Sequence, residues 1–290
     1  MRSTGQVILL AGACLLLTAL ALVKTEVGQL DYASTSMYSN FNVDGVLTQT
    51  FLGVMQDGNN NFLVSLGGTM VVRFAAGSTS ASLFAGLGAS SSNGVQATAA
   101  SMTNVVSLAG DTVGNVYLSD QGRHCIRRIG TDGVINTFAG TCGTSGSAID
   151  SVAATSSPLN TPRNIFYHTQ TNNLYIADSA NHRIRMVSVS TNIITTVMGT
   201  TQGDSINVAA TSAQINTPSD VWVDASGAMV VADNANYRLV RATSPSAIVT
   251  RFAGVGGSSS TTSYPSGIAA TSAQVGAVTA VTGDTSGNVY

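Results

Sequence analysis

The chain has 290 residues, of which 44% are hydrophobic and only 9% are charged, and its formal net charge is −2. Typical soluble domains carry about 25% charged residues, so we expect a surface that is polar but nearly uncharged. Because Lys and Arg do not exceed Asp and Glu, the composition excludes a nucleic-acid-binding role, which needs a basic footprint.

The N-terminus carries an apolar segment. Arg2 precedes an uncharged run from Val7 to Val23, and Ala19-Leu20-Ala21 has the small-x-small pattern of a signal-peptidase site. The run is long for a signal core and just reaches the lower limit for a membrane-spanning helix. We therefore expect residues 1–23 to be a cleaved signal peptide or an uncleaved anchor that tethers the protein to the membrane. Residues 24–44 would be an N-terminal segment, with the rest of the chain extracellular in either case.

The remainder of the chain is built from repeats. The segments YLSDQGRHCIRRI, YIADSANHRIRMV and VVADNANYRLVRA align, and their aspartates are Asp120, Asp178 and Asp233. Three further motifs recur in the same register: Phe-Ala-Gly or a variant, Asp-x-x-Gly, and Ala-Ala-Thr-Ser. A period of this length indicates an array of similar units, not one irregular globule.

One unit predicts four short strands. In the unit that contains Trp222, we expect strands over residues 218–223, 228–232, 237–242 and 248–253, because these runs are apolar and separated by turn residues. A single small sheet cannot bury both faces, and radial stacking of such sheets leaves only short protected edges. The fold class is therefore all-β, a β-propeller of four-stranded antiparallel blades.

The motifs also resemble a known family. The segments NLYIADSANHRIRMV (Asn173 to Val187) and AATSAQINTP (Ala209 to Pro218) are similar to the NHL-repeat family of β-propellers, with a match over residues 45–290. This propeller region contains three well-formed units, a divergent first unit and a last unit that stops at Tyr290. In the first unit, Leu66 takes the aspartate position and Met70 the position of His182. We expect about four and a half blades here, as part of a protein that is six-bladed when complete.

The repeated polar residues are interpreted as structural. Asp120, Asp178 and Asp233 recur in every good unit, whereas a catalytic acid need occur only once. Each can accept turn N–H groups or pair with an arginine. The arginines concerned are Arg183, Arg185 and Arg238. His124 and His182 share a position with Tyr237, which indicates packing or hydrogen bonding and not metal binding.

His168 differs from these because it stands where other units have Asp111, Asp224 and Asp284. It is a weak functional candidate, with a turn histidine as the alternative. Trp222 is expected to pack between blades, with a place in the central channel as its alternative.

Cys125 and Cys142 remain if the signal is removed, and in an oxidising compartment they could form a disulfide. A simple hairpin register argues against the bond, because a turn near Thr131 and Asp132 places Cys125 opposite Phe138. The pairing therefore stays open.

The function that these features favour is a rigid binding or scaffold module for a protein or glycan partner, without cofactor or metal. Its Gly/Ser/Thr-rich loops follow the fourth strand each time and would present contacts on one face. Two alternatives stay open. One is a metal-dependent extracellular lyase or hydrolase, since the resemblance extends to the peptide-amidating lyase and the sugar-lactone and strictosidine-type propellers. The other is an O-glycosylated structural or adhesive protein of the cell surface.

Overall fold

The structure is a computed structural model that describes residues 40–43, 46–78, 80–257 and 267–290, with side chains from residue 51 onward. The expected signal peptide or anchor at 1–23, and most of the segment 24–44, lie outside the described residues. Among the described residues, no helix has the length and apolar character that a membrane crossing requires.

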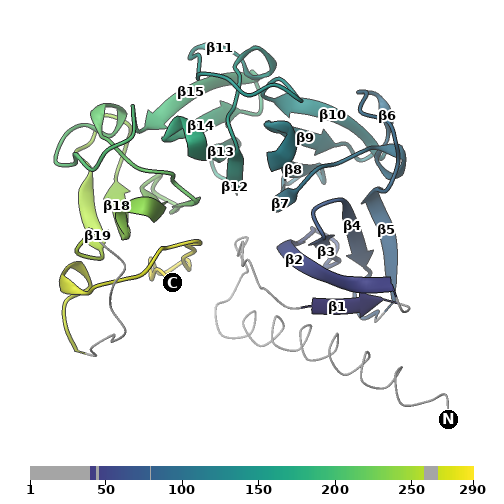
Figure 1. Ribbon diagram of the computed structural model, residues 1–290, viewed down its shortest axis with the longest axis horizontal. Coiled ribbons are helices and arrows are strands. Elements are labelled where there is room, and N and C mark those ends of the chain that lie inside the picture. Colours follow the sequence, from purple (N-terminus) through teal and green to yellow (C-terminus); the bar gives the residue numbers. More distant parts are fainter. Residues whose placement is uncertain (1–39, 44–45, 79, 258–266) are drawn as a thin grey trace.

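Four antiparallel sheets are arranged in an arc around a common centre (Figure 1). The first blade consists of β2 (Val46–Gln56), β3 (Phe62–Leu66), β4 (Met70–Phe74) and β5 (Ala81–Gly86). The second consists of β7 (Val105–Gly110), β8 (Val116–Asp120), β9 (Cys125–Ile129) and β10 (Val134–Ala139). The third consists of β12 (Pro162–His168), β13 (Asn173–Asp178), β14 (Arg183–Ser188) and β15 (Ile193–Met198). The fourth consists of β16 (Asp220–Val223), β17 (Met229–Asp233), β18 (Arg238–Ala242) and β19 (Thr250–Ala253).

The predicted fold class is confirmed: the chain forms a β-propeller of four-stranded antiparallel blades. The strands expected around Trp222 match β16 to β19 within two residues at every boundary. Beyond β19, Thr282 and Tyr290 pair through two backbone hydrogen bonds, as in the first hairpin of another unit. The total of six blades stays a prediction.

Short additional strands extend three of the sheets. β1 (Asn40–Val43) pairs with β2, while β6 (Val95–Gln96) and β11 (Val152–Ala153) pair with β10 and β15 on the outer edges of the second and third blades. The two outer strands belong to the segments that link successive blades. Part of the segment before the second blade and of the segment before the third blade is therefore built into the next sheet.

The core lies between blades. The inner strands β2, β7, β12 and β16 are neighbours around the centre, and β16 is buried along its whole length. Because β16 has packing partners on both faces, it is apolar after Asp220, whereas β12 has the polar residues Arg163 and Asn164 near its start. Separate apolar clusters fill the spaces between consecutive blades.

The Ala-Thr-Ser turns tie these blades together. The N–H of Ala154 donates to the Asn192 carbonyl of the third blade at 2.8 Å, and its own carbonyl accepts from Gly140, after the last strand of the second blade, at 2.9 Å. Ala210 repeats this arrangement with Ala247 and Gly199. The recurring motif is thus a backbone link from one blade to the next.

The first unit corrects one interpretation. Met70 does not take the place of His182, because β4 begins at Met70 itself, whereas β14 begins at Arg183, one residue after His182. The turn after Leu66 is one residue shorter than the turn after Asp178. Met70 therefore corresponds to Arg183.

The strand directions define two faces of the propeller. Inner strands begin on one face, and the fourth strand of the preceding blade ends on the same face, because consecutive strands are antiparallel. We call this the start face and the opposite one, where inner strands end, the far face. The linking segments return across the start face.

Candidate functional site

The three repeat aspartates have no solvent exposure and hold the chain just before the inner strands β7, β12 and β16. Asp120, Asp178 and Asp233 each accept a backbone N–H, at distances of 2.9, 2.7 and 2.7 Å. The donors are Thr103, Asn160 and Asn216, which lie two to four residues before an inner strand. Burial raises the pKa of Asp120 and of Asp178 to about 6, and it also raises the pKa of Asp233.

The buried arginines fasten the linking segments. The guanidinium of Arg185 donates to the Ile149 carbonyl at 2.8 Å and to the Asp150 carboxylate at 2.9 Å, and it lies 3.6 Å from Asp178. Arg238 binds Asp233 at 2.8 Å and the Asp204 carbonyl at 3.0 Å. These side chains lie inside the blades or against their loops, so they do not form a basic patch.

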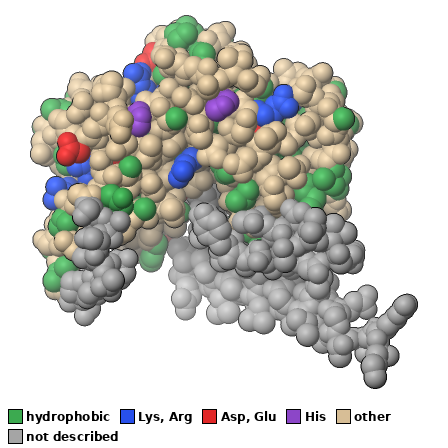
Figure 2. Space-filling model, in the orientation of Figure 1, with side chains coloured by type: hydrophobic (Ala, Val, Ile, Leu, Met, Phe, Trp, Pro, Cys, Tyr) green, Lys and Arg blue, Asp and Glu red, His purple; other side chains and the backbone are tan. Residues whose placement is uncertain are grey.

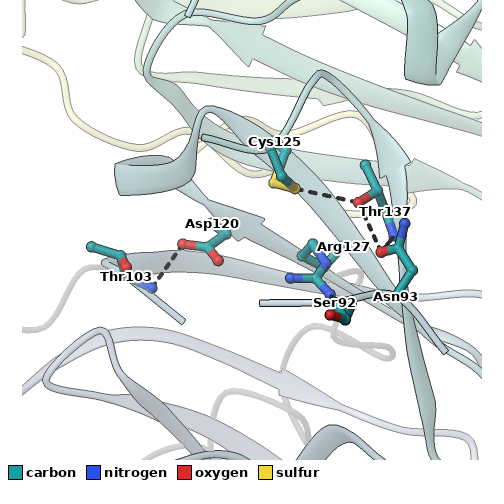
Figure 3. The surroundings of a disulfide bond; sticks show 8 residues. Ser92, Asn93, Thr103, Asp120, Cys125, Arg127 and Thr137 are labelled. Atoms are coloured by element: carbon teal, nitrogen blue, oxygen red, sulfur yellow. Dashed lines mark hydrogen bonds between the residues drawn. A yellow bond between two sulfur atoms is a disulfide. The ribbon is translucent and has the colours of Figure 1, made fainter. Parts of the chain in front are cut away.

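Figure 3 shows the corresponding group in the second blade, where Arg127 reaches the Ser92 carbonyl at 3.3 Å. Among the described residues, Asp120 Oδ2 and the Nε and Nη1 of Arg127 have no hydrogen-bond partner. Burial lowers the pKa of Arg127. Within the same described residues, Arg185 of the third blade also has no hydrogen bond at Nε and Nη1, but there both carboxylate oxygens of Asp178 accept hydrogen bonds.

His124 and His182 are hydrogen-bonding residues between blades. Both adopt left-handed backbone conformations, with φ of 56° and 54°, and end the short turn after the repeat aspartate. Their Nδ1 atoms accept the backbone N–H of Thr161 and Thr217 of the following blade, at 3.0 and 3.1 Å. Burial lowers the pKa of His182, which favours the neutral ring that this acceptor role requires.

Cys125 and Cys142 form a disulfide with a Cα–Cα distance of 5.0 Å. The simple register that placed Cys125 opposite Phe138 is wrong, because β10 has an irregularity after Thr137 and Ala139 faces Ile126. The chain then folds back through a hydrogen bond from the Gly143 N–H to the Arg123 carbonyl at 2.7 Å. This turn brings Cys142 to Cys125.

His168 lies in a far-face pocket of about 250 Å³ that also contains Phe166, Trp222 and Asp284. Both of its ring nitrogens are occupied, Nδ1 by Thr171 Oγ1 at 2.8 Å and Nε2 by the Asp224 carbonyl at 3.0 Å, and only 3% of the residue is exposed. Trp222 is also buried, and an added Cβ on Gly283 would lie 2.5 Å from its ring. His168 and Trp222 are therefore engaged in packing and hydrogen bonding within the propeller, which favours a structural role for both residues.

The start-face mouth of the central channel is different. A cavity of about 220 Å³ opens there among the inner strands, and of the described residues that line it only Arg163 is charged. Its other lining residues are Leu52, Asn104, Val106, Gln121, Asn164, Ser219 and Thr279. Arg163 is partly buried, and within the described part of the chain its guanidinium makes no hydrogen bond or ion pair.

Five of the lining residues occupy equivalent places around the ring. Leu52, Val106 and Arg163 are equivalent, because the residues that follow them, Gly53, Ser107 and Asn164, occupy matching strand positions. In the fourth and fifth units, the same position is taken by Ser219 and Thr279. The other four residues at this position are uncharged. A charge at this position is therefore not needed to build a blade.

Sequence reasoning missed Arg163 as a site residue. The repeat markers lie at the ends of strands, whereas Arg163 lies within the weakly patterned start of an inner strand. Aligning the inner strands by the Thr-Pro pairs near their start, with Pro162 against Pro218, could have shown an arginine where the next unit has Ser219.

No group of three or more His, Cys, Asp or Glu side chains in the described ranges is arranged to hold a metal ion. Figure 2 shows a face that is mostly uncharged, with scattered Lys/Arg and Asp/Glu groups. Charge is therefore sparse on this face, as the composition indicates.

Comparison with known proteins identifies the fold. No protein-family model matches the chain, and no curated protein matches it. Similar solved structures include an auxiliary nutrient binding protein from Bacteroides ovatus, with a TM-score of 0.50, 15% identity, and coverage of 71% of this chain and 48% of that one. A catalytically inactive virginiamycin B lyase from Staphylococcus aureus has a TM-score of 0.50 and 13% identity over 74% of this chain and 58% of that one. A chain of a nidogen/laminin complex has a TM-score of 0.52 and 12% identity, with 78% of each chain covered.

The chain thus spans about half the length of the first two of these structures. At such identities the likeness concerns the fold, and the neighbours themselves range from a binding protein to a lyase. The comparisons therefore identify the chain as a β-propeller protein.

Proposed function

We propose that this propeller is a rigid binding module, secreted or membrane-tethered and of the NHL-repeat type, that holds a protein or glycan partner on its start face. The observation that carries the proposal is the contrast between its two channel ends. At the far face, both ring nitrogens of His168 are engaged by neighbouring residues. At the start face, the guanidinium of Arg163 has no partner among the described residues and lines an open cavity.

The frame supports a binding role. Backbone bonds of Ala154 and Ala210, the aspartate contacts and the disulfide hold consecutive blades and their linking segments in place. A rigid support lowers the entropy lost when surface groups are ordered by a ligand. The linking segments return across the same face, so a partner seated on the channel mouth would also contact them.

The test uses two tryptophan variants of the same residue type. Thr279 lines the start-face cavity and Thr285 lines the far-face pocket, and both are exposed. The purified chain is screened on arrays of defined extracellular proteins and glycans, and every hit is measured again with each variant. We expect Thr279→Trp to abolish binding by occupying the cavity, and Thr285→Trp to leave it unchanged.

Thermal unfolding of both variants supplies the control for folding. Hits that survive Thr279→Trp in a folded protein, or that are lost with Thr285→Trp alone, would contradict the proposed binding face.

A further inference from the structure

We propose that Arg163 is a receptor for one carboxylate, donated by an acidic side chain of a protein partner that inserts into the start-face mouth. The inference rests on the proposed function, because it names the chemistry of that same face. It is motivated by Arg163, the one charged side chain among the described residues of the cavity lining, whose guanidinium has no partner among them.

The setting of the guanidinium favours an anionic ligand. It is partly buried, so a partner that covers the mouth would remove its water and leave an unpaired charge unless it supplied an acceptor. The neighbouring acidic residue of the fourth blade, Asp220, is directed to backbone groups. Asp220 is 2% exposed, does not line the cavity, and accepts the N–H groups of Val221 and Val281 at 2.8 and 2.9 Å.

Amide groups next to Arg163 can complete the site. The Asn104 side-chain nitrogen donates to Gln121 Oε1 at 2.6 Å, which fixes the Gln121 amide at the mouth. The Gln121 nitrogen has no partner of its own among the described residues and can donate to a second ligand oxygen. A guanidinium and an amide donor together match the two oxygens of a carboxylate.

The charge and shape of the lining select among anions. A single guanidinium neutralises one negative charge, which suits a carboxylate better than a phosphate dianion. None of the described lining residues is aromatic, so they offer no platform on which a pyranose ring would pack. Leu52 and Val106 instead offer aliphatic contact for the methylenes of a glutamate, in a space of about 220 Å³.

The test titrates capped Ala-Glu-Ala and Ala-Gln-Ala peptides, with glucuronate and inorganic phosphate as further ligands, and follows the Arg163 Nε–Hε resonance in the unchanged protein and the Gln121 side-chain amide resonances in every variant. This resonance is assigned from its absence in Arg163→Lys. We expect the glutamate peptide alone to shift it, with weakening by added salt. Arg163→Gln should weaken binding roughly tenfold or more, and Arg163→Lys should restore it only in part. Arg73→Gln, at an exposed arginine of the first blade, should have no effect.

Equal binding of the glutamine peptide, unchanged glutamate binding in Arg163→Gln, or tighter binding of glucuronate or phosphate would overturn the inference. Its failure is distinguishable from failure of the proposed function. Array hits that are lost in Thr279→Trp but kept in Arg163→Gln would leave the binding face intact and remove the carboxylate receptor.

Discussion

Three aspartates without solvent exposure illustrate how single residues support this fold. Each carboxylate replaces water by a backbone N–H at the start of an inner strand, and Asp178 also accepts from Asn181 at 2.8 Å. In a less solvated interior the charged form is disfavoured, and these hydrogen bonds offset only part of that cost. The burial cost therefore dominates, and the pKa of Asp120 and of Asp178 is raised to about 6.

This shift predicts a pH dependence of stability. Because the folded pKa lies above the ordinary value of 3.8, the contribution of each group is fully present below about pH 4 and is lost as the pH rises through about 6. The difference is on the order of 3 kcal/mol per carboxyl group. We expect Asp178→Asn to flatten the decline of the unfolding free energy between pH 4 and 6, measured by denaturant titration.

The exposed Asp204 supplies the matched control, since Asp204→Asn should reproduce the pH profile of the unchanged protein. A wild-type profile that rises over this range, or an Asp178→Asn profile parallel to it, would show that burial does not govern the carboxyl group.

At the scale of elements, the strand that follows the repeat aspartate in the second and third blades fastens the segment leaving its own blade. In the third blade, Arg183 Nε donates to the Thr200 carbonyl at 3.0 Å. In the second blade the equivalent residue is Cys125, and its bond to Cys142 holds the corresponding segment. One position in the blade thus performs the same role with an ionic side chain or a covalent bond.

Removing the disulfide tests this role. Its two cysteines are 17 residues apart, and a loop of this size implies a stabilisation of about 3 kcal/mol in the chain-entropy model. We expect a double Cys125→Ser, Cys142→Ser variant to lose this amount in denaturant titration and to become insensitive to reductant. A double Cys125→Arg, Cys142→Thr variant should recover part of the loss.

Reductant that destabilises the serine variant as much as the unchanged protein would contradict a specific contribution from this bond. Equal stability of the serine and arginine variants would show that an arginine at position 125 does not replace the disulfide in the way that Arg183 acts in the third blade.

At the scale of the whole molecule, stability depends on the fit between neighbouring blades. Trp222 of the fourth blade is 5% exposed and lies against Gly283 of the following unit. An added Cβ on Gly283 would lie 2.5 Å from the indole ring, closer than a normal contact. Since blades contact only their neighbours, strain at one interface acts on a stability that is approximately a sum of such interfaces.

We expect Gly283→Ala to destabilise the protein by roughly 1–3 kcal/mol, because the ring is packed and cannot move freely. The cost should be smaller in a Trp222→Leu background, which removes the indole. Thermal and denaturant unfolding of both single variants and of the double variant would measure this coupling. If the losses of unfolding free energy in the two single variants simply add in the double variant, the two residues do not interact across one interface.

Much of the blade could be predicted from the sequence, because the strands and turns of one blade are formed by residues close together in the chain. The strands around Trp222, the turn at Asp224 and the repeat at Asp233 all depend on residues within one unit of the period. Hydrophobic patterning and turn chemistry act over such short distances, so they are readable without neighbouring units. The all-β class and the stacking of blades followed from the same local signals.

Only the tertiary structure decided the disulfide geometry and the candidate site. The irregularity in β10 and the fold-back at Gly143 bring Cys142 to Cys125, and neither follows from a regular hairpin register. Arg163 becomes distinctive only when strands more than fifty residues apart converge around the channel. The period determines what each blade is, whereas its closure around an axis determines which side chains meet there, because that proximity arises from packing between units.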